Sequence, residues 1–82
     1  FPNPVSSEST IEFMLNETVK VDVIIYDLSG KKMHSICEGQ EFESGKHQIE
    51  FNVEDSRFKN GTYIAVVKAG EISASKRFVV TK

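Results

Sequence analysis

Residues 19–31, VKVDVIIYDLSGK, decide the fold of this chain. The first apolar residues of the stretch fall at every second position, so their side chains point to one face of an extended strand. They are Val19, Val21, Val23 and Ile25. Ile24 and Tyr26 make the other face apolar too, which predicts a strand that runs from a sheet margin into an interior covered on both faces. Asp27 and Gly30 then suit a type I turn, so we expect the first half of a buried hairpin.

Two other segments alternate on one face only. Residues 10–15 carry Ile11, Phe13 and Leu15 on one side, and residues 47–53 carry His47, Ile49, Phe51 and Val53 on one side. This period of two predicts strands with one buried face.

Three further strands are predicted with different positions in the sheets. Residues 31–38 have a weaker pattern that includes exposed lysine, which favours an edge. Residues 62–68 are apolar on both faces, so we expect them at the centre. The final strand, residues 73–81, follows Gly70 and Glu71, which fit a two-residue type II′ hairpin loop.

Two phenylalanines stand alone among polar residues. Phe42 lies between Gly39 and Gly45, in what we interpret as a loop or a short edge strand. Phe58 lies in the charged segment 54–60, just before the turn signal Asn60-Gly61. We expect both rings to be anchored on the core.

These six or seven short strands, with frequent turns and no helical periodicity, predict an all-β fold. The expected architecture is an immunoglobulin-like antiparallel β-sandwich of about seven strands in two sheets, with a barrel as the alternative. Because 82 residues suffice for one domain, we divide the chain into residues 1–9, a linker end that leads into the domain, and residues 10–82, the single sandwich.

Composition restricts the function. The net charge of -2 gives no electrostatic footprint for nucleic acid or anionic lipid, so neither is an expected partner. Cys37, the only cysteine, allows no internal disulfide, and we expect a half-buried strand thiol. The chain starts at Phe1 without an initiator Met, which suggests a fragment or processed product of a longer protein.

No residue pattern indicates catalysis. His34 and Cys37 lie three apart, on opposite faces of a regular strand, so they would not form a metal site or a Cys–His pair. The acidic pairs Glu41/Glu43 and Glu54/Asp55 lack the spacing of a calcium loop. We therefore expect no enzyme, cofactor, metal or small-molecule substrate. Sugar binding stays open, although without Trp nothing selects it.

Short motifs follow one another in a characteristic order. They are Phe1-Pro2-Asn3-Pro4, then IYDLSGK over residues 25–31, Gly45-Lys46-His47, Phe58 followed by Gly61, Tyr63 and Val66, and the terminal KRFVVTK of residues 76–82. In this order they resemble the type A C-terminal sorting domain of proteins exported by the bacterial type IX secretion system.

The resemblance implies a non-catalytic sorting signal that is covalently linked to an N-terminal cargo. Such a domain folds in the periplasm, is recognised by the outer-membrane translocon and is commonly removed by a sortase-like peptidase. The cargo is then released or joined to lipopolysaccharide. The expected location is the cell surface or exterior of a Gram-negative bacterium.

The resemblance also implies roles for individual residues. Translocon recognition would involve Phe1, Pro2, Asn3, Pro4, Lys76, Arg77, Phe78, Val79, Val80 and Lys82. Structural turn and core positions would be Tyr26, Asp27, Gly30, Gly45, Phe58, Gly61 and Tyr63. The backbone of the final strand could also be recognised by strand addition. Alternatives are an immunoglobulin- or fibronectin-like spacer, an adhesion module, or a carbohydrate-binding accessory module of a secreted protein.

Overall fold

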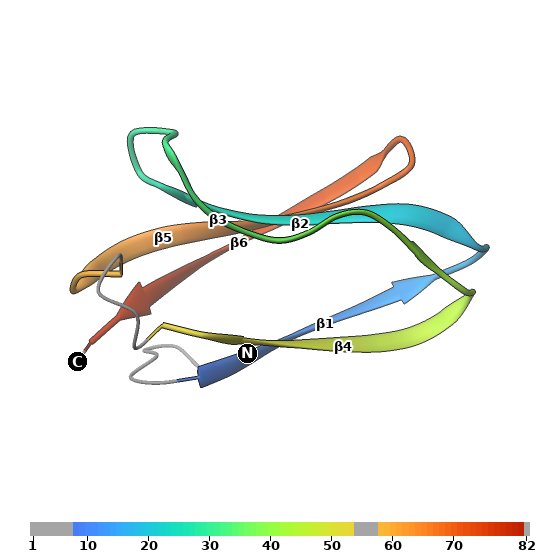
Figure 1. Ribbon diagram of the computed structural model, residues 1–82, viewed down its shortest axis with the longest axis horizontal. Coiled ribbons are helices and arrows are strands. Elements are labelled where there is room, and N and C mark those ends of the chain that lie inside the picture. The colour runs from blue at the N-terminus through green and yellow to red at the C-terminus, as the bar shows by residue number, and fades with distance from the viewer. Residues whose placement is uncertain (1–7, 54–57, 82) are drawn as a thin grey trace.

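The computed structural model describes residues 8–53 and 58–81, which fold into two layers of antiparallel strands (Figure 1). The strands are β1 (Glu8–Leu15), β2 (Val19–Asp27), β3 (Lys32–Phe42), β4 (Gly45–Asn52), β5 (Gly61–Ala69) and β6 (Ile72–Val80). The all-β sandwich is confirmed, with six strands in these residues where about seven were expected. None of the described elements is a helix long and apolar enough to cross a membrane.

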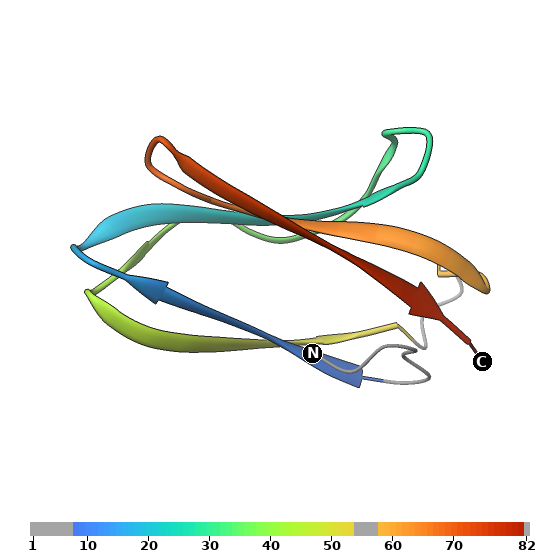
Figure 2. The same cartoon turned by 180° about the vertical axis from the view of Figure 1, so that it is seen from behind.

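The larger layer is a four-stranded sheet in the order β3-β2-β5-β6, and the smaller layer pairs β1 with β4. Figures 1 and 2 show the small sheet on one side of the large one. Strands β2 and β5 occupy the centre, as their two apolar faces predicted. The β2–β3 and β5–β6 pairs are hairpins, whereas β1–β4 and β2–β5 join segments that are distant in the sequence.

Strand β3 corrects two expectations. It continues without a break to Phe42, so the predicted loop or separate edge strand between Gly39 and Gly45 is wrong. The regular strand that was assumed in placing His34 and Cys37 on opposite faces is also wrong, because the β2–β3 pairing shifts register at three places. Such bulges place two residues opposite one and bend the strand, and Gly39, with φ of 68°, supplies the backbone freedom for one of them.

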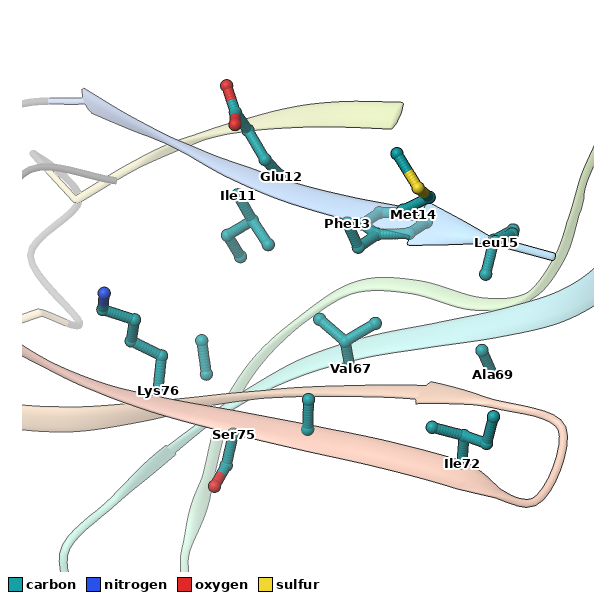
Figure 3. A pocket seen from close by; sticks show the side chains of 12 residues that line it. Ile11, Glu12, Phe13, Met14, Leu15, Val67, Ala69, Ile72, Ser75 and Lys76 are labelled. Carbon is teal, nitrogen blue, oxygen red and sulfur yellow. The ribbon is translucent and has the colours of Figure 1, made fainter. Parts of the chain in front are cut away.

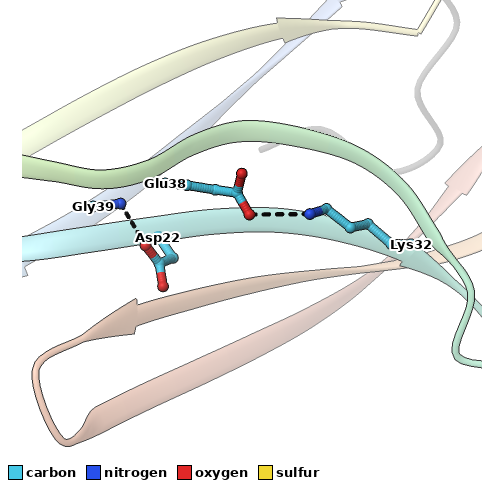
Figure 4. Close-up of polar contacts among 4 residues, drawn as sticks. All are labelled: Asp22, Lys32, Glu38 and Gly39. Carbon is cyan, nitrogen blue, oxygen red and sulfur yellow. Dashed lines mark hydrogen bonds and ion pairs between the residues drawn. The ribbon is translucent and has the colours of Figure 1, made fainter.

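Two polar contacts hold this irregular edge in place (Figure 4). The Gly39 N–H donates to the carboxylate of Asp22 on β2, at 2.5 Å. Lys32 and Glu38, both on β3, form an exposed ion pair with an N···O distance of 3.0 Å. The predicted edge position of β3 is confirmed.

The core lies between the two sheets. The buried apolar side chains are Ile11, Leu15, Val21, Val23, Ile25, Phe51, Val53, Phe58, Tyr63, Ala65, Phe78 and Val80. The one-sided alternation of β1 and β4 is confirmed, because Glu12, Met14, Gln48 and Glu50 are exposed. Phe58 is 1% exposed, so its expected anchoring on the core is also confirmed.

The outer face of the large sheet is the third correction. Ile24 and Tyr26 lie directly opposite Val66 and Ile64 on β5, and all four side chains are only half-buried. Within the described residues, both strands of the small sheet lie on the other face (Figures 1 and 2). The interior covered on both faces, which the sequence predicted, is therefore wrong. Cross-strand neighbours shield one another here instead.

Candidate functional site

Strand β6 combines a buried face with a charged, exposed one. Phe78 and Val80 are 0% and 1% exposed, while Lys76, Arg77 and Val79 are exposed. Because successive side chains of a strand point to opposite faces, Arg77 and Val79 lie on the outer face of the sheet.

Aromatic contacts hold the C-terminal half of β6 in place. The Phe78 ring stacks on Tyr63 of β5 with a centroid distance of 5.9 Å. It also meets Phe51 of β4 in an edge contact at 5.6 Å. Phe78 thus connects the two sheets, and it fixes the position of the exposed residues on either side of it.

The segment before β5 is closed by Tyr63. Its hydroxyl donates to the Lys59 carbonyl oxygen at 2.7 Å, and its ring meets Phe58 at 5.4 Å. Gly61, with φ of 155°, begins the strand between them. A tyrosine that hydrogen-bonds to the backbone a few residues upstream also closes a corner in immunoglobulin-type sandwiches.

The β2–β3 turn is held by Asp27. Its carboxylate oxygen Oδ1 accepts hydrogen bonds from the Ser29 hydroxyl at 2.6 Å, the Ser29 N–H at 2.9 Å and the Lys31 N–H at 2.9 Å. The Gly30 N–H donates to the Asp27 carbonyl oxygen at 3.1 Å. The Ser29 hydroxyl, followed by the Lys31 N–H, lowers the pKa of this carboxyl below its ordinary value. Asp27 is a turn residue, as predicted.

The β3–β4 connection is closed in a different way. Gly45 has a φ of 122°, and Nε2 of His47 lies 2.6 Å from the Glu43 carbonyl oxygen. Because a carbonyl only accepts, this contact places a ring proton on Nε2. The Phe42 ring packs edge-on against Phe13 at 5.5 Å and His47 at 5.0 Å, which confirms Phe42 as an anchor.

The two chemically reactive side chains of β3 have structural surroundings. The bulges bring Cys37 against the core, where its S–H donates to the Val21 carbonyl oxygen at 3.6 Å. Burial raises the pKa of the Cys37 thiol. The His34 ring contacts Phe58 at 6.3 Å. Within residues 8–53 and 58–81 no three possible metal ligands lie together.

The described aromatic side chains are all buried or half-buried, so these residues offer no exposed aromatic platform for a sugar. Several residues assigned roles from the sequence lie outside the described residues. They are Phe1, Pro2, Asn3, Pro4, Glu54, Asp55 and Lys82.

Sequence reasoning missed an apolar cleft between β1 and β6 (Figure 3). Ile72 borders it and is 71% exposed. The alternation of apolar residues with serine at the start of β6 was the available sequence signal, because such alternation marks an apolar inward face. Only the pairing of the strands shows that, within residues 8–53 and 58–81, no strand covers this face.

The fold and these contacts define a class: a small antiparallel β-sandwich closed by turn and corner residues. The sequence model of the secretion system C-terminal sorting domain family matches residues 1–81. The chain belongs to this family of type IX secretion signals. No curated protein and no solved structure is significantly similar to it.

Family membership settles the function at a coarse level. The domain is a sorting signal for type IX secretion, in a family that is generally non-catalytic. It implies interaction with the secretion machinery and a secreted or cell-surface protein of a Gram-negative bacterium.

Proposed function

We propose that the outer-membrane translocon recognises the exposed residues of β6, and that a sortase-like peptidase then removes the domain from a covalently linked N-terminal cargo. The observation that carries this proposal is the division of β6 into two faces. Phe78 and Val80 are buried, whereas Arg77 and Val79, on the opposite face, are exposed. Lys76 is exposed too, but it lies on the inward face and borders the cleft between β1 and β6. The buried pair holds the strand, and the exposed residues lie on the surface that another protein would contact.

This division separates two roles that the sequence motif combines. In the folded domain, Phe78 and Val80 support recognition by holding the strand in position, while Arg77 and Val79 would make direct contact. The route we propose includes folding in the periplasm before recognition, because the presented face exists only when β6 is packed on β5 and the core.

The test is an export assay in a bacterium with an active type IX system. Residues 1–82 are fused behind a signal peptide and a folded reporter protein, and the reporter is measured in the periplasm and in the medium. We expect export of the wild-type fusion and periplasmic retention of the Arg77→Glu/Val79→Asp double variant. The matched control is Lys68→Glu, which reverses an exposed charge on β5 and should leave export intact.

The outcomes separate the parts of the proposal. Retention of the wild-type fusion would refute the sorting role of this chain. Export of the double variant at the wild-type rate would refute recognition through β6. Both substitutions are on the exposed face, so the double variant should fold. Circular dichroism of the purified variants verifies this.

Processing is tested on the same exported reporter. We expect its mass to correspond to the cargo without the sorting domain, because the domain is cut off during or after export. An exported reporter that keeps the intact domain would contradict removal by a peptidase.

A further inference from the structure

The cleft between β1 and β6 leaves Ile72 and Ala74 exposed, although both lie on the inward face of β6. Its volume is about 350 Å³. The lining comes from the inward faces of three strands, and includes Ile11 and Leu15 of β1, Val67 and Ala69 of β5, and Ile72 and Ala74 of β6. In Figure 3 the side chains of Ile11 and Val67 point into the space between the sheets.

One wall of the cleft is the edge of β1. Glu12 and Met14 border the cleft, although their side chains point away from it in Figure 3, so their backbone contributes to the wall. Among the described residues β1 pairs with β4 alone. Its other edge therefore offers backbone donors and acceptors to an incoming strand.

The opposite wall and floor are the first half of β6 and the adjoining part of β5. The inward face of β6 is buried at Phe78 but exposed at Ile72 and Ala74. The small sheet is thus too narrow to cover the large sheet at this end. A third strand beside β1 would lie over Ile72 and Ala74, at the usual spacing of stacked sheets, about 10 Å.

We infer that the cleft binds a single extended segment of a partner protein, which pairs with the edge of β1 and becomes the third strand of the small sheet. Residues 11–15 of β1 border the cleft, and at about 3.3 Å per residue they match a partner segment of roughly five residues. Alanines at positions 65, 69 and 74 line the site and leave room for larger side chains. The partner segment therefore alternates branched apolar residues, facing inward, with polar residues.

A second copy of this chain does not fit the same place. Antiparallel pairing of two β1 edges would put both large sheets on the same side of the extended small sheet. The large sheet reaches past β1 on this side, since β6 forms the far wall of the cleft. The β6 strands of the two copies would then overlap beside the paired β1 edges. A single strand fits there, whereas a whole second domain does not.

This inference goes beyond the sorting role and is tested on the purified 82-residue chain without any export machinery. The probe is a blocked seven-residue peptide that alternates threonine with valine, titrated into the ¹⁵N-labelled domain. We expect saturable one-to-one shifts of the amide resonances of residues 10–15 and 72–75. The control peptide has proline at its central position, which removes an N–H and prevents strand pairing.

Charge substitutions inside and outside the cleft provide the matched comparison. Ile72→Asp and Ala74→Asp place a carboxylate against the peptide's apolar side chains, and should weaken binding by about tenfold or more, because burying an unpaired charge is costly. Ser73→Asp adds the same charge to the other face of the same strand and should leave affinity within about twofold. All three positions are exposed, so folding should be preserved.

Four results would overturn the inference. They are the absence of shifts at millimolar peptide, equal binding of the proline peptide, equal binding by Ala74→Asp, and shifts confined to the outer face of the large sheet. Self-association through β1, detected by sedimentation and abolished by Ala74→Asp, would assign the cleft to a second copy and refute the partner segment.

Discussion

At the scale of single residues, Asp27 links the stability of the β2–β3 turn to pH. Its carboxylate accepts hydrogen bonds from the Ser29 hydroxyl and the backbone of Ser29 and Lys31, which lower its pKa in the folded domain from the ordinary 3.8. A lowered carboxyl pKa stabilises the fold above the unfolded value, and this contribution is lost as the pH falls through the folded pKa.

We therefore expect Asp27→Asn to be less stable than the wild type at neutral pH, with a difference that shrinks as the pH is lowered below 3.8. Urea midpoints at a series of pH values measure this difference. Ser29→Ala removes only the hydroxyl donor and should give a smaller loss of stability at neutral pH. A difference that stays constant down to strongly acidic pH would show that the Asp27 charge does not stabilise the turn.

At the scale of elements, Gly70 and Gly39 both need a positive φ but have different surroundings. Gly70, in the β5–β6 turn, has a φ of 64°, and Gly39, in the bulged β3, has a φ of 68°. A Cβ on Gly70 would lie 3.3 Å from Val19 Cγ2, whereas a Cβ on Gly39 would have nothing within 4 Å. The positive φ at Gly70 alone, without one at Glu71, matches the predicted type II′ loop.

Gly39→Ala should therefore cost about 1–2 kcal/mol, the price of a left-handed conformation for an L-residue. Gly70→Ala should cost more, because it adds the tight contact with Val19. Chemical denaturation of both variants gives the comparison. Equal losses would mean that Val19 moves aside freely, and a larger loss for Gly39→Ala would contradict the contact argument.

At the scale of the whole molecule, stability depends on few side chains because the core is thin. Domains are stable by about 0.05–0.15 kcal/mol per residue, which for 82 residues corresponds to roughly 4–12 kcal/mol. Phe78 is 0% exposed and joins the sheets through Phe51 and Tyr63.

Phe78→Ala should accordingly destabilise the domain by about 3–5 kcal/mol, a large share of the total. Val79→Ala, at the next position with 37% of the side chain exposed, should cost less than about 1 kcal/mol. Urea unfolding followed by circular dichroism measures both. Similar losses for the two variants would contradict the assignment of Phe78 to the core and Val79 to the exposed face.

The regular strands and tight turns were predictable because neighbouring residues in the sequence determine them. The period of two identified the buried faces of β1 and β4, and paired apolar faces placed β2 and β5 at the centre of a sheet. The turn at Asp27 and the loop at Gly70 followed from the conformations that those residues permit. For the candidate site, the exposed basic residues of β6 were visible in the terminal motif, but the burial of Phe78 beneath them was not predicted.

The sequence by itself thus determined the strands, the turns, most of the core and the sorting-domain motifs. Only the tertiary structure decided the bulged path of β3, the half-exposed outer face of the large sheet, and the open cleft between β1 and β6. The reason is that alternation records which residues prefer an apolar environment, and carries no information about which distant strand supplies it. In the described part of the chain, a two-stranded layer packs on a four-stranded one and leaves some apolar residues without that cover.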